Sequence, residues 1–127
     1  MKRRILVIED QEDNRRILRD LLTAAGYEVI EAENGGDALP CATAHRPDLI
    51  LMDIQLPVLD GYEATRRLKA DPTVCGIPVI VITSYALSGD EGKARAAGCD
   101  DYVTKPYSPR QVLAKIRTYL PEFRDAP

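Results

Sequence analysis

Five polar residues of this sequence stand at or just after the ends of short, largely apolar runs: Glu9, Asp10, Asp53, Thr83 and Lys105. Carboxylates that share a cleft repel one another, so at least one pKa should rise unless a cation neutralises them. Few dedicated oxygen ligands indicate Mg²⁺, which keeps several of its waters. With Mg²⁺ and the Lys105 ammonium present, a phosphoryl group can approach, and a carboxylate can attack it to give an acyl phosphate. Asp53 is the natural nucleophile because it follows a central apolar run.

The apolar runs before these residues have the length of buried strands. Residues 5–8, 49–52 and 79–82 are continuously apolar, which is typical of strands that are covered on both faces. Residues 28–32 form a more polar second strand, which we expect nearer an edge of the sheet. Residues 101–104 form a short fifth strand.

Helical segments alternate with these strands, at residues 11–25, 34–45, 62–70, 88–97 and 109–120. This alternation predicts an α/β protein with a doubly wound, five-stranded parallel sheet and five helices. Right-handed crossovers place all carboxyl ends of the strands at one edge, where such sheets bind their ligands. The polar strand ends should therefore meet in one cleft.

Composition narrows the class of protein further. The 127 residues suffice for one domain, which we expect over residues 1–120, with residues 121–127 as a short flexible tail. A net charge of −3 argues against broad electrostatic binding of nucleic acid. Three cysteines without a C-x-x-C pair argue against a disulfide scaffold or a zinc knot and favour the cytoplasm. Only four apolar residues follow the basic start, too few for a signal sequence or a membrane span.

The whole pattern over residues 4–120 resembles the receiver domain of two-component response regulators. Thr83 lies 30 residues after Asp53, Tyr102 another 19 residues on, and Lys105 three later. The residues that carry the resemblance are Glu9-Asp10, Asp53, Pro57, Gly61, Thr83 and Lys105-Pro106. It implies a flavodoxin-like strand order of 2-1-3-4-5. Residues 49–57 and 61–66 look most similar to stand-alone cell-division-control regulators and to hybrid-kinase receivers.

The resemblance implies a role for each residue of the predicted site. Asp53 takes a phosphoryl group from a phosphohistidine. Asp10 and Asp53 hold Mg²⁺ together with the backbone carbonyl of Gln55, and Glu9 joins directly or through water. Lys105 pairs with the phosphate.

Further residues implied by the resemblance report the phosphorylated state. Thr83 donates a hydrogen bond to a phosphoryl oxygen, and Tyr102 follows it inward as a rotamer switch. The Lys105–Pro106 bond is expected to be cis, which only a bond before proline permits at low cost.

The resemblance implies that the chain is a signalling phosphoacceptor rather than an enzyme, although it assists its own phosphorylation and dephosphorylation. Expected partners are a sensor histidine kinase or histidine phosphotransfer protein and a downstream protein. No output domain, nucleic acid or membrane is expected, and the chain should be a monomer or weak dimer.

Other functions fit the residues less well. Haloacid-dehalogenase-type phosphohydrolases place an acid/base Asp two residues after the nucleophile, where this chain has Gln55. A nucleotide- or flavin-binding module needs a glycine-rich phosphate loop, and residues 9–14 are acidic and contain no glycine. A receiver that signals without phosphorylation is a further alternative, but the predicted phosphorylation site of this chain looks intact. Each residue also has a structural reading: Glu9 and Asp10 as helix caps, Thr83 and Tyr102 as ordinary strand residues. The single histidine, His45, lies outside the cleft and is no phosphohistidine.

The sequence departs from the family pattern at two places that concern the site. Glu9 replaces the commoner Asp, and its extra methylene favours contact with the metal through water. Tyr85 follows Thr83 by two residues and, with Gln55 on the other side, should hinder water and slow self-dephosphorylation. Replacing Tyr85 by Ala should accelerate it.

Two helices carry unfavourable residues. Pro40 removes a backbone hydrogen bond and costs about 3 kcal/mol inside a helix. We therefore expect a kink there, or a helix that begins near Pro40 as its first residue. The segment 88–97 contains Gly89 and Gly92, and its low helix propensity predicts the most mobile helix. We expect the face that it forms with the fifth strand and fifth helix to change on phosphorylation.

Overall fold

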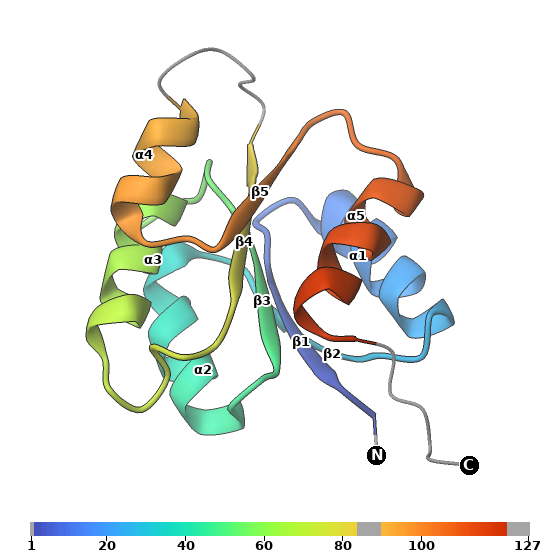
Figure 1. Cartoon of the computed structure of the whole chain (residues 1–127), viewed down its shortest axis with the longest axis horizontal. Coiled ribbons are helices and arrows are strands. Elements are labelled where there is room, and N and C mark those ends of the chain that lie inside the picture. The colour runs from blue at the N-terminus through green and yellow to red at the C-terminus, as the bar shows by residue number, and fades with distance from the viewer. Residues whose placement is uncertain (1, 84–89, 122–127) are drawn as a thin grey trace.

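The computed structural model describes residues 2–83 and 90–121. Five parallel strands form one sheet in the order β2-β1-β3-β4-β5 (Figure 1). Their bounds are β1 Arg4–Ile8, β2 Glu28–Ala32, β3 Leu49–Asp53, β4 Val79–Thr83 and β5 Asp101–Thr104. This is the predicted fold class and strand order, with the polar strand β2 at an edge as expected.

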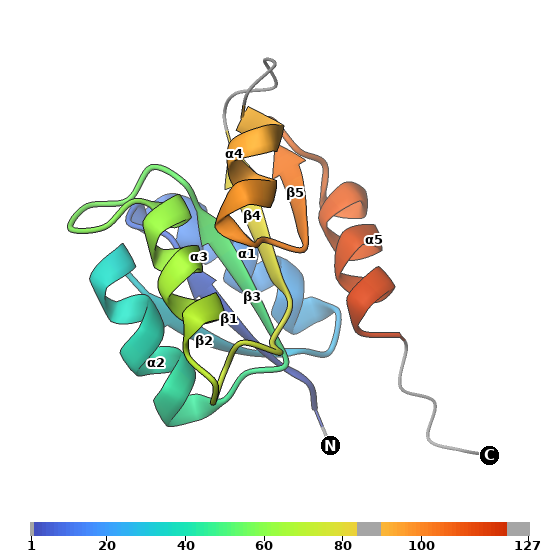
Figure 2. The ribbon, with the colours of Figure 1, turned by 60° about the vertical axis from the view of Figure 1, so that its left-hand side comes forward.

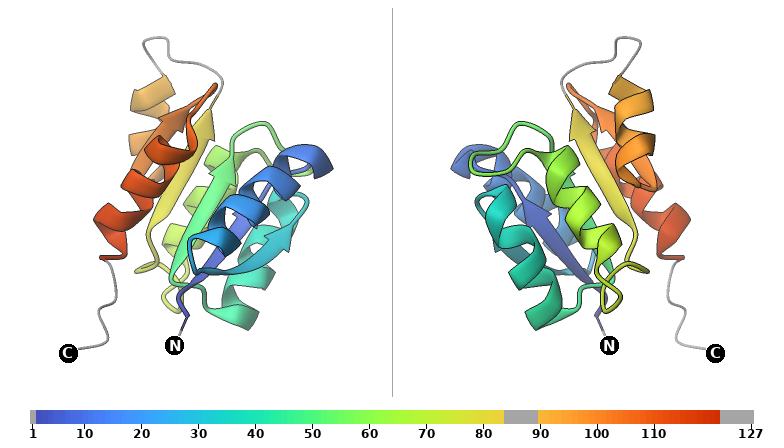
Figure 3. Two further views of the ribbon diagram at one scale, coloured as in Figure 1. Left: turned by 90° about the vertical axis from the view of Figure 1, so that its right-hand side faces the viewer. Right: turned by 90° about the vertical axis from the view of Figure 1, so that its left-hand side faces the viewer.

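Helices cover both faces of the sheet. The helices α1 (Glu12–Ala24) and α5 (Pro109–Tyr119) lie on one face. The other face carries α2 (Ala38–His45), α3 (Gly61–Ala70) and α4 (Asp90–Ala97) (Figure 2). The two side views show the opposite layers and the common direction of the strands (Figure 3). All carboxyl ends of the strands therefore lie at one edge.

Alternate residues of the strands pack into two separate hydrophobic cores, one on each face of the sheet. Leu6, Ile8, Ile50, Met52, Val79 and Val81 pack beneath α2 and α3, with Ala64 and Leu68 of α3. Ile5, Val7, Leu49, Leu51, Ile80 and Ile82 pack beneath α1 and α5, with Leu22 and Ile116. Every residue of β3 and β4 is buried, as the continuous apolar runs predict for strands covered on both faces. The central strands thus hold the site on a rigid base.

Local signals fix the ends of several helices. Gly26 after α1 and Gly98 after α4 have φ angles of 97° and 96°, a conformation that glycine adopts without a steric cost. Asp60 caps α3 by accepting a hydrogen bond from the Glu63 N–H at 2.8 Å. Ser108 and Gln111 form a reciprocal capping box at the start of α5.

The second helical segment differs from its prediction. A 3₁₀ turn, η1 (Gly35–Asp37), precedes α2, so the segment is broken as expected. Pro40 is the third residue of α2 rather than its first, which corrects the predicted position. Proline is tolerated there because the first four N–H groups of a helix have no partner within the helix. A Cβ at Gly35 would overlap the carbonyl oxygen of Leu59, so only glycine fits this turn.

Several expectations concern residues at the margins of the described structure. All three cysteines are free: Cys75 is exposed, and Cys41 and Cys99 are half-buried. Tyr85, Gly89 and the tail after Pro121 lie outside the described residues. The mobility of α4 stays a prediction. Across residues 2–83 and 90–121, no helix combines the length and apolar character that a membrane crossing needs.

Candidate functional site

Three carboxylates meet at the carboxyl ends of β1 and β3. One oxygen from each of Glu9, Asp10 and Asp53 lies within 4.8 Å of the others. Glu9 and Asp53 are buried, with 2% and 4% of their surface exposed, whereas Asp10 is half-buried. The Glu9 N–H donates to the Ala32 carbonyl at 3.1 Å and so continues the strand pairing past the end of β1. The backbone of the two central strands therefore brings the carboxylates together.

Asp53 is held on both of its carboxylate oxygens. Lys105 Nζ lies 3.2 Å from Oδ2, and the Gln55 N–H donates to Oδ1 at 3.3 Å. The Lys105 N–H donates to the Thr83 carbonyl at 2.7 Å, which extends the pairing of β4 with β5. The Lys105–Pro106 peptide bond is cis. The ammonium of Lys105 thus balances part of the negative charge of the cluster.

Gly61 brings α3 directly against this aspartate. A Cβ on Gly61 would overlap the carbonyl oxygen of Asp53. The Gly61 N–H donates to the Ile54 carbonyl at 2.9 Å. Backbone therefore meets backbone here, and the absence of a side chain at position 61 permits the contact.

The electrostatics of the cluster show most clearly at Glu9. Burial raises the pKa of Glu9 to about 8, and the adjacent Asp53 adds to the rise through its hydrogen bond and its charge. Asn14 and Lys105 act in the opposite direction, since both favour the ionised form. The expectation that at least one crowded carboxylate has a raised pKa is confirmed. In the metal-free protein, Glu9 therefore keeps its proton to a higher pH than an ordinary glutamate, which lowers the negative charge of the cleft.

Thr83 and Tyr102 lie on the β4–β5 side of the same sheet. Thr83 ends β4 and is 4% exposed, so its side chain is buried at the edge where the carboxylates meet. Tyr102 lies on β5, and Lys115 of α5 places its ammonium 5.8 Å from the centre of the tyrosine ring. Tyr102 also lines a surface cavity of about 490 Å³ between β5 and α5. Their switch roles stay predictions.

Three further residues of the site region escaped the sequence prediction. The Asn14 amide donates to Glu9 Oε1 at 3.1 Å, and Arg15 donates to the Glu9 carbonyl at 2.9 Å. Tyr107 is half-buried, and its pKa is raised by burial and then by the charges of Glu9 and Asp53. The available signals were weak: Asn14 lies one helical turn after Asp10, and Tyr107 two residues after Lys105.

The donor set matches the chemistry of a hard divalent cation. Glu9, Asp10 and Asp53 offer carboxylate oxygens in a small, largely buried cluster, against which Lys105 places its ammonium. Oxygen donors of this kind suit Mg²⁺, which needs few protein ligands and keeps several waters. The residues present therefore fit Mg²⁺. A ligand role for the Gln55 carbonyl stays a prediction.

Comparison with known proteins agrees with this geometry. The model of the response regulator receiver domain matches residues 5–117. The polar-differentiation response regulator DivK of Brucella anthropi is 47% identical over 120 residues, which cover 94% of this chain and 98% of that protein. DivK of Brucella ovis is 45% identical over the same shares.

Solved structures of receiver-type proteins are also similar to this chain. The receiver domain of the sensor histidine kinase PA1611 from Pseudomonas aeruginosa, with a magnesium ion coordinated in its active-site cleft, is 34% identical with a TM-score of 0.89. That comparison covers 96% of this chain and 100% of the other. The chemotaxis response regulator CheY4 of Vibrio cholerae is 25% identical with a TM-score of 0.88, over 94% and 99% of the two chains.

Proposed function

This chain belongs to the response regulator receiver domain family, and on that premise we propose that Asp53 accepts a phosphoryl group from a phosphohistidine. The donor is a sensor histidine kinase or a histidine phosphotransfer protein. One observation carries the proposal: a buried aspartate, with Lys105 at 3.2 Å, shares its cleft with two further carboxylates. Such a cleft repels an incoming phosphoryl group until a cation neutralises it.

Glu9, Asp10, Asp53 and the Gln55 carbonyl are the ligands that would hold Mg²⁺. A bound Mg²⁺ supplies neutralisation of the carboxylates and stabilisation of the charge on the transferring phosphoryl oxygens. The magnesium ion in the cleft of the PA1611 receiver supports this assignment by similarity. Glu9 carries one more methylene than Asp, and contact through water is the arrangement that we favour for it.

The residues of the chain then have separate tasks. A carboxylate oxygen of Asp53 attacks phosphorus as the bond from phosphorus to the donor's imidazole nitrogen breaks, and the imidazole keeps that electron pair. Lys105 stays beside the new acyl phosphate and stabilises its negative oxygens. The buried Thr83 hydroxyl lies at the same edge and donates a hydrogen bond to the phosphoryl group.

The output of the proposed reaction is a change in protein binding. When Thr83 moves toward the phosphoryl group it vacates space, and Tyr102 turns inward from the β5–α5 surface. The face formed by α4, β5 and α5 then presents a different set of side chains to a downstream protein. The half-buried position of Tyr102 supports this role, because its ring has both an inward and an outward environment.

Intact-mass spectrometry after incubation with acetyl phosphate tests the proposal. Wild-type protein should gain one phosphoryl group when Mg²⁺ is present and none when it is chelated. Asp53→Asn should gain none, whereas Asp20→Asn, which removes an exposed carboxylate of α1, should behave like wild type. Equal labelling of Asp53→Asn and wild type would refute Asp53 as the acceptor. A second arm uses a phosphorylated histidine phosphotransfer protein as donor.

A further inference from the structure

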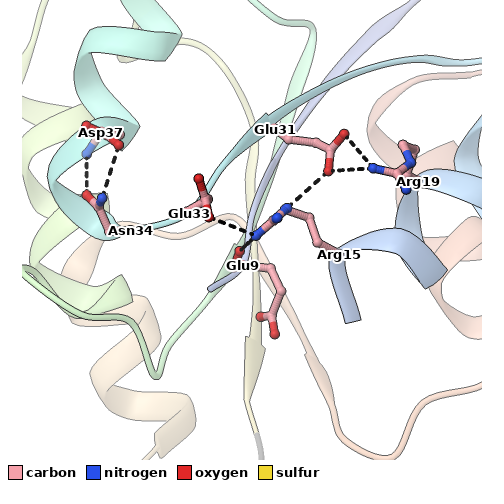
Figure 4. A network of polar contacts seen from close by, with 7 residues as sticks. All are labelled: Glu9, Arg15, Arg19, Glu31, Glu33, Asn34 and Asp37. Atoms are coloured by element: carbon pink, nitrogen blue, oxygen red, sulfur yellow. Dashed lines mark hydrogen bonds and ion pairs between the residues drawn. The ribbon is translucent and has the colours of Figure 1, made fainter. Parts of the chain in front are cut away.

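Arg15 lies at the centre of a polar network between α1 and the end of β2. Its Nε donates to Glu31 Oε1 at 3.1 Å, and its Nη1 lies 3.8 Å from Glu33 Oε1 (Figure 4). The same Nη1 donates to the backbone carbonyl of Glu9 at 2.9 Å. Only 12% of the Arg15 side chain is exposed, whereas its partners Glu31 and Glu33 are 27% and 73% exposed. Arg15 thus joins the end of β2 to the first residue after β1.

Besides its contact with Asp53, Glu9 is held by three hydrogen bonds. Its N–H bonds the Ala32 carbonyl, its carboxylate accepts from Asn14 at 3.1 Å, and its carbonyl accepts from Arg15. The following turn into α1 lacks another common support, because the N-cap residue Gln11 makes no side-chain capping bond. A charged donor on a carbonyl is stronger than a neutral one. Arg15 therefore supplies the firmest hold on the backbone between Glu9 and α1.

We propose that Arg15 is a positioning residue, which sets the backbone at Glu9 so that Glu9 and Asp10 are placed to bind Mg²⁺. This inference rests on the proposed function, since it assigns Arg15 a task toward the same cation. Mg²⁺ demands near-ideal octahedral geometry, so small displacements of a ligand are costly. Partners that orient metal ligands typically contribute 10- to 100-fold in metal affinity.

The sign of the effect separates positioning from simple electrostatics. Removing a positive charge near a carboxylate cluster strengthens its attraction for a cation. Coulomb's law alone therefore predicts tighter Mg²⁺ binding when Arg15 becomes Met. Loss of positioning predicts weaker binding, in the opposite direction.

Arg19 provides a matched control one helical turn later. Its Nη1 contacts both carboxylate oxygens of Glu31, each at 3.1 Å. Within the described residues, the polar contacts of Arg19 go to Glu31 alone. Arg15→Met and Arg19→Met thus each remove one positive charge and one pairing with Glu31, but only Arg15→Met also releases the carbonyl of Glu9 and the longer, 3.8 Å contact with the exposed Glu33.

Calorimetric titration of Mg²⁺ into metal-free protein, without any phosphodonor, measures the effect. Arg15→Met should raise the Kd for Mg²⁺ about tenfold. Arg19→Met should leave the Kd unchanged or slightly lower. Arg15→Lys keeps the charge but replaces the planar fork by a single ammonium nitrogen, so its Kd should fall between wild type and Arg15→Met. Because this variant changes the protein least, it carries the test if Arg15→Met fails to fold.

The rate of phosphorylation by acetyl phosphate gives a second readout. A merely structural role of Arg15 would not separate an effect on the Mg²⁺ requirement from an effect on the maximal rate. Arg15→Met should need about tenfold more Mg²⁺ for half-maximal rate, yet reach a rate within about twofold of wild type at saturating Mg²⁺. An unchanged or tighter Kd in Arg15→Met would overturn the inference, as would equal weakening in Arg19→Met. If wild type binds Mg²⁺ but Asp53 is not modified, the proposed function fails and the positioning role survives. If wild type binds no Mg²⁺, both fail.

Discussion

The two sides of the sheet edge are built very differently. On the β1–β3 side, Glu9 and Asp53 are buried; Glu9 accepts hydrogen bonds from Asn14 and Arg15 of α1, and Asp53 accepts them from the Gln55 N–H and from Lys105. On the β5–α5 side, Tyr102 is half-buried and its ring is covered by Lys115, whose side chain is 42% exposed. The first side fixes geometry, and the second is held by contacts that are each worth little. The proposed function uses both: fixed ligands for Mg²⁺, and a surface whose contacts cost little to break.

Core truncations should show the largest difference between the two sides. Leu51→Ala removes a side chain of β3 that is 1% exposed, so the free energy of unfolding should fall by about 2–5 kcal/mol. Thr104→Ala at the half-buried end of β5 should cost less than about 1 kcal/mol. Urea unfolding monitored by circular dichroism measures both. Similar losses would contradict the division into a rigid and a soft side.

The pH dependence of the metal-free protein probes the crowded carboxylates. The folded-state pKa of Glu9, about 8, lies above its ordinary value of 4.5, so between these pH values the folded state holds a proton that the unfolded state has lost. Stability should therefore fall as the pH rises from about 4.5 to about 8, by a few kcal/mol in order of magnitude.

Glu9→Gln should remove most of that fall, because its amide does not titrate. Glu33→Gln changes a carboxylate whose side chain is 73% exposed and should keep the wild-type slope. Urea unfolding in a chelating buffer at several pH values measures the slopes. A wild-type slope in Glu9→Gln would show that the pH dependence has another origin.

Mg²⁺ should stabilise the β1–β3 side by mass action. At about 100 times its Kd, a ligand that binds only the folded state raises the free energy of unfolding by about 2.7 kcal/mol. Thermal unfolding with and without Mg²⁺ should show this gain in wild type and a much smaller one in Asp10→Asn. Calcium-free buffer and the exposed-site variant Asp20→Asn serve as controls.

The smallest change in stability should come from replacing Lys115, whose ammonium lies over the ring of Tyr102. Lys115→Met removes both the cation above the ring and the 2.9 Å ion pair with Asp101. We expect a loss of less than about 1 kcal/mol in the free energy of unfolding. The aromatic NMR signals of Tyr102 should nevertheless shift and broaden, whereas Arg117→Met on the exposed face of α5 should leave them unchanged. Unperturbed Tyr102 signals in Lys115→Met would show that the ring is held by other contacts.

The sequence predicted the central strands because a strand that is buried on both faces consists of a continuous run of apolar residues. Residues 5–8, 49–52 and 79–82 are continuously apolar, and each forms the body of a buried strand. The rule that parallel strands share one carboxyl edge then placed Glu9, Asp10 and Asp53 together without knowledge of any relative. The strand order itself came from the resemblance, because alternation alone does not specify it.

The positions that sequence reasoning missed depend on contacts between elements. Asn14 and Arg15 occupy ordinary polar positions of a helix, and nothing in their spacing says that they reach back to Glu9. Pro40 was recognised as a helix breaker, but its place as the third residue of α2 follows from the 3₁₀ turn at residues 35–37, where only glycine fits beside the Leu59 carbonyl. The propensities of single segments do not predict such contacts between different elements.

The backbone of Gly61, at the start of α3, lies directly against the carbonyl of Asp53, the proposed phosphoryl acceptor. Because no side chain separates the two backbones, we expect any displacement of the first turn of α3 to displace the backbone at Asp53 as well.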